Sequence, residues 1–318
     1  MILFILIFII SILFLFWSSR WLVESLTKIA KFLGWREFVF AFWIMAVAGS
    51  LPNIFVGIGS IIEGVPVLSL GEIFGGNIVD LTIAVALTVL ISKNGLSVQS
   101  RTVRGTAFFT LIVAILPLLL IHDRVLSRID GMVLLLIFII YVFWLFSKQE
   151  RFTRVYDGEE KKVEIKEITN NLFLLIGATV LLFLAAGGII KTSIFFAETF
   201  NVPLILIGIL VVGLGNALPE IFFGIQAARK DEDWMVVGGL MGAVIGAGSL
   251  ALGLVALLQP IYLNYPEVSL LMVTRIFLIL AAIFFLLFIR TNHKITRKEG
   301  IFLLIVYLSF IIVQILIV

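Results

Sequence analysis

The sequence contains no cysteine and only two histidines. Without cysteine the chain has no disulfide, no thiolate metal ligand and no cysteine nucleophile. His122 and His293 lie far apart without metal-ligand spacing, which argues against zinc, copper or iron sites. The apolar segments also lack a metalloprotease motif, a paired-aspartate protease motif and a nucleophile with a matching base. We therefore predict that the chain is not an enzyme and needs no cofactor.

Charged residues are also scarce. They make up 14% of the chain, against 62% apolar residues and a mean hydropathy of +1.22. This composition predicts an integral membrane protein whose surroundings are a lipid bilayer. The net charge of +3 does not indicate nucleic-acid binding, because the basic residues follow the membrane topology described below. The apolar stretch Met1 to Trp17 is interpreted as a retained first span, since it lacks a basic n-region and a clear cleavage site.

Ten segments are long and apolar enough to cross a bilayer. We place these spans at 2–18, 38–60, 68–92, 105–121, 130–147, 170–190, 204–228, 235–258, 269–289 and 300–318. The amphipathic stretch Ser19 to Glu37 is expected to extend the first helix along or out of the interface.

Lys and Arg are distributed unevenly between the two sides of these spans. Alternate loops hold 19 of them, whereas the opposite loops hold three, and one more lies inside the ninth span. The positive-inside rule makes the richer side cytoplasmic. Both termini are therefore expected to be extracytoplasmic, with the protein in the cell membrane.

Two stretches of the sequence match at an offset of 167 residues. Leu51-Pro52-Asn53-Ile54-Phe55 aligns with Leu218-Pro219-Glu220-Ile221-Phe222, each near the middle of an apolar span. Each proline removes one helical hydrogen bond. Five spans per half is an odd number, so the halves must insert in opposite directions, as in many secondary transporters. We predict an all-α integral membrane protein of ten transmembrane helices, formed by two inverted five-helix repeats (1–147 and 170–318) joined by a cytoplasmic linker (148–169), with broken helices in spans two and seven.

The polar residues deepest in these spans are oxygen-bearing. Asp80 and Glu220 lie near the centres of spans three and seven, where an ionisable side chain costs about 3 kcal/mol or more and usually has a function. Carboxylates, amides, a hydroxyl and loosened carbonyls favour a hard cation such as Ca²⁺ or Na⁺. The candidate ligands are Glu220, Asp80, Asn53, Asn216, Ser50 and Asn77.

Structural explanations stay open for these residues. The two acids could form a hydrogen-bonded pair that holds helices together, and Asn53 and Asn216 could bond between helices. Glu72, about 12 Å nearer the outer face than Asp80, could attract cations at an entrance or be an exposed rim residue. Gly71 and Gly75, with the matching glycines of span eight, are best explained by close helix packing.

The duplicated motif resembles the alpha repeats of the calcium/cation antiporter superfamily, the sodium/calcium exchangers. The resemblance covers essentially the whole chain, and each repeat of that family typically carries Gly-Thr-Ser-Leu-Pro-Glu. Glu220 and Ser50 match the motif, and Asp80 takes the place of a first-repeat Asn or Asp. The departures are Asn53 for a glutamate, Gly49 and Asn216 for threonines, Ala217, Gly76 and Ala243 for serines, and Ala247 for an acidic residue.

The resemblance implies a secondary-active cation antiporter that exchanges Ca²⁺ against Na⁺ or H⁺ by alternating access. The first and sixth spans would slide past the other eight. The departures leave two alternatives: an exchanger of altered specificity, for a monovalent or another divalent cation, and a degenerate relative that does not transport.

Overall fold

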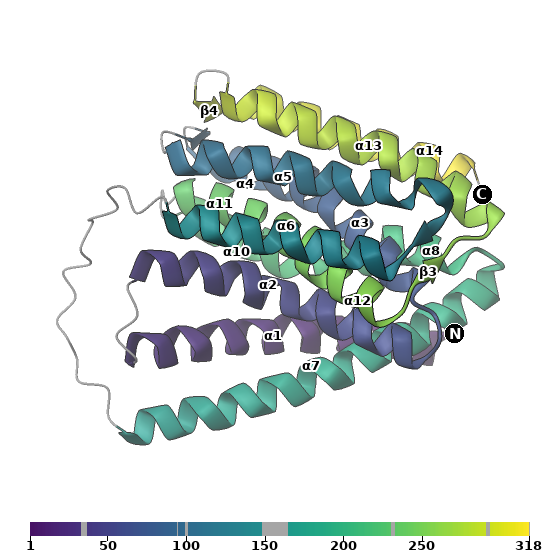
Figure 1. Cartoon of the computed structure of the whole chain (residues 1–318), viewed down its shortest axis with the longest axis horizontal. Helices are drawn as coiled ribbons and strands as arrows, with labels where there is room; N and C mark the ends of the chain where they lie inside the picture. Colours follow the sequence, from purple (N-terminus) through teal and green to yellow (C-terminus); the bar gives the residue numbers. More distant parts are fainter. Residues whose placement is uncertain are drawn as a thin grey trace.

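The computed structural model describes residues 1–32, 37–93, 95–98, 101–147, 165–229, 233–290 and 293–317. These residues form a bundle of long helices that run in alternating directions, and both chain ends lie at the same end of the bundle (Figure 1). Most of the predicted linker, residues 148–164, lies outside the described residues.

The first half of the chain contains the helices of spans one to five. They are α1 (Ile2–Phe32), α2 (Glu37–Ile62), the run of α3 (Val67–Val79), η1 (Asp80–Ala84) and α4 (Val85–Ile91), then α5 (Arg101–Leu120) with the 3₁₀ turn η2 (Ile121–Asp123), and α6 (Arg128–Ser147).

The second half repeats this order with more interruptions. It consists of α7 (Ile165–Phe200), the run of α8 (Leu204–Ile207), η3 (Gly208–Val212), α9 (Gly213–Asn216) and α10 (Leu218–Arg229), the run of α11 (Asp233–Ile245), η4 (Gly246–Ala251) and α12 (Leu252–Leu258), then α13 (Tyr265–Arg290) and α14 (Arg297–Leu316).

The predicted spans match these helices. Nine stretches of the described chain are long and apolar enough to cross a membrane, and a shorter apolar stretch, Gly49–Ile62, belongs to α2. Two of the described helices exceed their predicted spans by more than ten residues. α1 continues to Phe32, as its amphipathic extension suggested, and α7 runs from Ile165 to Phe200 rather than over 170–190.

Helix irregularities lie at mid-span in the central helices. η1, η3 and η4 are π-helical turns inside spans three, seven and eight, a feature often found at functional sites. Span seven is broken at Ala217, between α9 and α10, as predicted. Span two differs from the prediction, because α2 continues through Pro52 without a break, although a proline cannot donate its helical hydrogen bond.

The two halves face opposite ways. Phe4 of α1 stacks on Phe195 near the end of α7, with ring centroids 3.7 Å apart, so the first helices of the two halves are antiparallel. α1 also touches the rest of the bundle, through an edge contact between Phe16 and Phe222 of α10.

Two short strand pairs show the same symmetry. β1 (Leu96–Ser97) pairs antiparallel with β4 (Lys294–Ile295), and β2 (Val125–Leu126) pairs antiparallel with β3 (Ile261–Tyr262). Each pair joins the loop after the third helix of one half to the loop after the fourth helix of the other. The two pairs lie at opposite ends of the bundle (Figure 1), as an inverted repeat requires.

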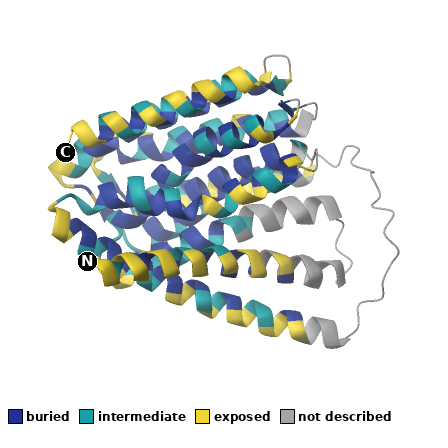
Figure 2. Cartoon of the chain, turned by 180° about the vertical axis from the view of Figure 1, so that it is seen from behind, coloured by how far each residue is buried: buried dark blue, intermediate teal, exposed yellow. Residues whose placement is uncertain are grey.

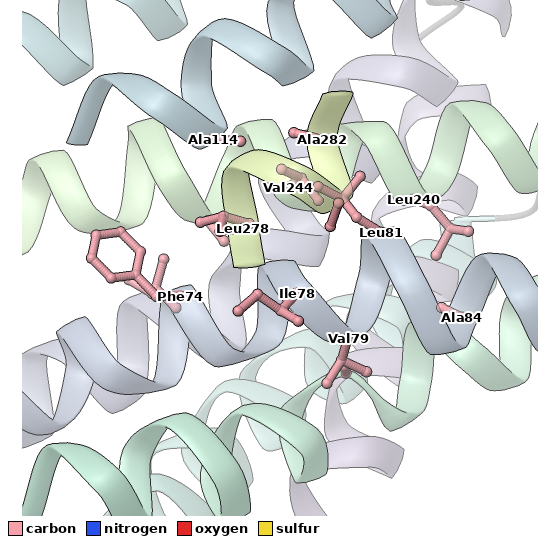
Figure 3. Packing of buried hydrophobic residues seen from close by; sticks show 14 of the residues in the cluster. Phe74, Ile78, Val79, Leu81, Ala84, Ala114, Leu240, Val244, Leu278 and Ala282 are labelled. Carbon is pink, nitrogen blue, oxygen red and sulfur yellow. The ribbon is translucent and has the colours of Figure 1, made fainter. Parts of the chain in front are cut away.

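Spans three and eight form the centre of the molecule. Buried residues make up 78% of the apolar window of span three and 83% of that of span eight, against 28% for α1, α6 and α14. Figure 2 shows the contrast, with dark blue central helices and yellow outer faces. In Figure 3, Phe74 and Ile78 pack with Val244 and Leu278 in this core, which leaves the outer apolar faces for lipid.

Spans three and seven cross at very short range because glycines lie at the crossing. A Cβ atom at Gly75 would lie 2.0 Å from the carbonyl oxygen of Ile209. The predicted packing role is thus supported at Gly75. The matching Gly242 is different, since a Cβ there would meet nothing within 4 Å.

Candidate cation-binding site

Residues from α2, span three, span seven and span eight meet around one small cavity in the middle of the bundle. It is lined by Asn53, Ile73, Gly76, Asn77, Asp80, Asn216, Ala217, Glu220, Ala243 and Ala247. Its volume of about 10 Å³ is enough for roughly one water molecule, and hence for one ion of similar size.

The local helix geometry explains why polar residues reach this point. Asp80 begins the π-helical turn η1, and Asn216 ends α9 just before the break at Ala217. Glu220 lies in the first turn of α10, directly after this break. The interruptions thus place side-chain oxygens at mid-membrane.

Several oxygen atoms at the cavity are buried without a hydrogen-bond partner among the described residues. They are Oδ1 of Asn77, Oδ1 of Asp80, Oδ1 of Asn216 and Oε2 of Glu220. Buried polar atoms in folded proteins are nearly always paired, and the exceptions often mark an ion or a water. The carboxylates of Asp80 and Glu220 also interact electrostatically, and among the described residues no cationic side chain pairs with either. A bound cation would satisfy both charges and the free oxygens.

The two asparagines bond to each other as well as lining the cavity. The side-chain amide of Asn216 donates one hydrogen bond to Oδ1 of Asn53, at 2.7 Å, and a second to Oε1 of Glu72. Interhelical bonding, which the sequence left as an alternative to ion contact, is therefore present. It does not exclude ion contact, because Oδ1 of Asn216 stays without a partner at the cavity.

Five of the six predicted ligands line the cavity: Asn53, Asn77, Asp80, Asn216 and Glu220. Ser50, about one turn before Asn53 on α2, is fully buried but is not among the lining residues. Ser50 is not without an interaction partner.

Glu72 corrects the sequence interpretation. It is neither at an entrance nor on an exposed rim, because it is 0% exposed and bonded to Asn216 in the protein interior. Because Glu72 lies far from Asp80 along the helix, the sequence predicted a position near the membrane surface. The signal that was overlooked is its neighbourhood of small residues, Gly71 and Gly75, which bring span seven close to this part of α3.

The two halves contribute unequally to the cavity. At the repeat offset of 167 residues, Asp80 corresponds to Ala247 and Gly76 to Ala243, and both alanines line the cavity. Span eight therefore supplies no side-chain oxygen at these positions. The acids come from span three in the first half and span seven in the second.

Comparisons with known proteins agree with this architecture. The family described as sodium/calcium exchanger protein matches residues 3–147 and 170–316. The sodium/calcium exchanger MaX1 of Methanosarcina acetivorans is 26% identical, with 97% of each chain covered. The inner membrane protein YrbG of Escherichia coli is 24% identical, over 93% of this chain and 91% of YrbG.

Solved structures show the same fold. The sodium-calcium exchanger NCX_Mj, soaked with Na⁺ and Sr²⁺, superimposes with a TM-score of 0.67 at 24% identity, covering 98% of both chains. The same exchanger soaked with Na⁺ and Ca²⁺ gives 0.64 at 26% identity, also with 98% coverage of both. With matches that span both halves, the chain belongs to the sodium/calcium exchanger family of membrane antiporters.

Proposed function

We propose that the protein exchanges Ca²⁺ against Na⁺ or H⁺ across the cell membrane, and that the cations bind between Asp80 and Glu220. The observation that carries this proposal is the set of buried, unpartnered oxygens around one ion-sized cavity. Family membership makes transport the expected use of such a cavity.

The donor set favours a hard cation. Carboxylate and amide oxygens line the cavity, and Ca²⁺ binds six to eight oxygens at roughly 2.3 to 2.6 Å. Among the described residues there is no group of three or more His, Cys, Asp or Glu that could hold a metal ion, so the amides must supply part of the coordination. Asp80 and Glu220 together carry enough charge to neutralise one Ca²⁺ or two monovalent cations.

Exchange follows from competition for these two carboxylates. A site filled by Ca²⁺, by monovalent cations or by protons is close to neutral, whereas a bare pair of negative charges is costly to move through the bilayer. Only loaded states would then cross easily, and this couples the two fluxes.

For the movement itself, we infer that α1 and α7 slide together past the other helices. They pack on each other through Phe8, Leu15, Ala178 and Leu182, in an apolar cluster that also includes residues of α2, α3 and span seven. The site lies outside this pair, in the rest of the bundle. This separation fits rocking of one group of helices around a fixed site.

The orientation and the repeat boundaries are part of the same proposal. We place the loops that carry 19 Lys and Arg in the cytoplasm and both termini outside. Residues 1–147 and 170–318 would be the two repeats, joined by a cytoplasmic linker at 148–169. Fusing a reporter enzyme to the C-terminus and testing its activity on each side of the membrane would check the orientation.

Ala243 and Ala247 favour one alternative, an altered cation specificity. Span eight gives the site no side-chain oxygen at these positions, so the cavity has fewer ligands for a divalent ion than a symmetric pair of repeats would have. A monovalent cation requires fewer such ligands than a divalent one. The degenerate, non-transporting alternative has less support, because one carboxylate from each half, Asp80 and Glu220, still lines the cavity.

Uptake of ⁴⁵Ca²⁺ into proteoliposomes tests the proposal. Vesicles loaded with Na⁺ and diluted into choline should accumulate Ca²⁺, and an imposed pH gradient tests H⁺ as the counter-ion. Flux of Na⁺ or K⁺ without Ca²⁺ flux would favour the altered specificity. Absence of gradient-dependent flux for Ca²⁺, Na⁺ and K⁺ would favour the degenerate alternative.

A further inference from the structure

Glu72 is a third carboxylate next to the cavity, and the exchange of cations at Asp80 and Glu220 does not account for it. It lies on α3, two turns before Asp80, and is 0% exposed. Its repeat mate at the offset of 167 residues is Gly239, so the duplication does not explain its presence.

This carboxylate is only partly satisfied. Oε1 accepts a hydrogen bond from the Asn216 amide, whereas Oε2 is buried and has no partner within the described part of the chain. No Lys, Arg or His pairs with Glu72 in the part of the chain that the structure describes. A buried negative charge with one neutral donor is strongly unfavourable unless a bound cation or a proton neutralises it.

The surroundings of Glu72 offer further oxygen atoms. Oδ1 of Asn216 is buried and unpartnered on the same amide that bonds to Glu72. The π-helical turn η3 and the start of α9 cross α3 at this residue: a Cβ at Gly208 would lie 3.0 Å from the backbone nitrogen of Glu72, and a Cβ at Gly213 would lie 2.9 Å from its backbone carbonyl oxygen. The π-helical turn and the backbone of Glu72 thus lie side by side, and π-helical turns are often found at functional sites.

We propose that Glu72 and Asn216 form a second cation position, beside the cavity, that takes a monovalent cation such as Na⁺. This inference rests on the proposed cation exchange and adds a binding position to it. The charge argument selects a monovalent ion, because Asp80 and Glu220 already balance one divalent ion and Glu72 adds a single negative charge.

Asn216 links the two positions. It lines the cavity and donates to Glu72, and the Glu72 carboxylate interacts electrostatically with that of Glu220. An ion at Glu72 would therefore affect cation binding at the central site, both through the shared amide and through its charge. The fully loaded protein would carry Ca²⁺ together with one monovalent cation, or monovalent cations alone.

Thermal unfolding of the purified full-length protein tests this position without measuring transport. The unfolding midpoint is followed by tryptophan fluorescence in saturating Ca²⁺, while Na⁺ replaces choline at constant ionic strength. A ligand that binds only the folded state raises the midpoint in a concentration-dependent way. Because Ca²⁺ occupies the central site, the added effect of Na⁺ reports the Glu72 position.

We expect Na⁺ to raise the midpoint of the wild type under these conditions and to have no effect on Glu72→Gln. The glutamine side chain can still accept from the Asn216 amide, so this variant removes the charge and keeps the hydrogen bond. The Ca²⁺ concentration that half-saturates Glu72→Gln should differ from that of the wild type by less than about threefold. Glu72→Asp, which keeps the charge, should retain a Na⁺ effect with a higher half-saturating concentration. Glu63→Gln, an exposed change of the same type, should behave as wild type.

Three results would overturn the proposal. The first is no added Na⁺ effect in the wild type, and the second is an unchanged effect in Glu72→Gln, which would make Glu72 an anchor for Asn216. The third is a tenfold loss of Ca²⁺ affinity in Glu72→Gln, which would place Glu72 at the Ca²⁺ ion itself. If Ca²⁺ did not stabilise the wild type at all, the proposed Ca²⁺ exchange would fail instead. The Glu72 position would then be tested by the effect of Na⁺ alone on the unfolding midpoint. Glu72→Gln is again expected to lose this effect.

Discussion

Replacing Glu220 by glutamine should weaken Ca²⁺ binding severely. The change keeps the shape and one oxygen of the side chain but removes one of the two carboxylate charges at the cavity. Asp80 would then face a divalent ion with half of the compensating charge. Breaking a buried charge pair by removing one partner costs about 3 to 5 kcal/mol. That cost corresponds to a loss of affinity of between about a hundredfold and a few thousandfold.

Isothermal titration calorimetry on the purified protein measures this loss directly. Glu63→Gln is the matched control, because it makes the same chemical change on the exposed turn after α2. The control should bind Ca²⁺ as the wild type does. If Glu220→Gln also bound Ca²⁺ with the wild-type affinity, the carboxylate would not be a ligand, and the assignment of the central site would be wrong.

Three further predictions concern the ligand set, the packing and the movement. Asn53→Glu should tighten Ca²⁺ binding about tenfold in calorimetry, since it adds a carboxylate to the cavity lining, and weaker binding would contradict this role. Gly75→Ala should lower the unfolding midpoint by several degrees, at a cost of about 1 to 3 kcal/mol for overpacking, whereas Gly242→Ala should leave it nearly unchanged. In this cysteine-free chain, a cleavable thiol cross-link between Phe4→Cys and Phe195→Cys should preserve ⁴⁵Ca²⁺ flux, because both lie in the sliding pair. The equivalent link across the aromatic contact between α1 and α10 should stop flux until it is cleaved, and the reverse pattern would refute the sliding of α1 with α7.

The fold was predictable because a bilayer constrains the chain so strongly. Span length, the asymmetry of basic residues and the duplicated motif were each visible in the sequence, and together they led to ten spans in two inverted halves. The break at Ala217 also followed from local chemistry, since glycine, proline and a polar run occur together there. Pro52 shows the limit of that reasoning, because α2 stays helical through it.

The central site was predictable for residues whose depth in the membrane was informative. Asp80, Glu220, Asn53 and Asn216 lie near span centres, and inverted halves bring span centres together. Glu72 was misplaced because depth along a helix says little about which face a side chain occupies. Its burial depends on the close crossing of spans three and seven, which is a tertiary contact and is not a property of α3 alone.

Anomalous diffraction from crystals soaked in Sr²⁺ tests the central claim most directly. Sr²⁺ stands in for Ca²⁺ and scatters anomalously. We expect one dominant peak in the cavity between Asp80 and Glu220, bonded to oxygens of both carboxylates and lost in Glu220→Gln crystals. A soaked crystal with no peak there, or with its strongest peak away from both acids, would contradict the account.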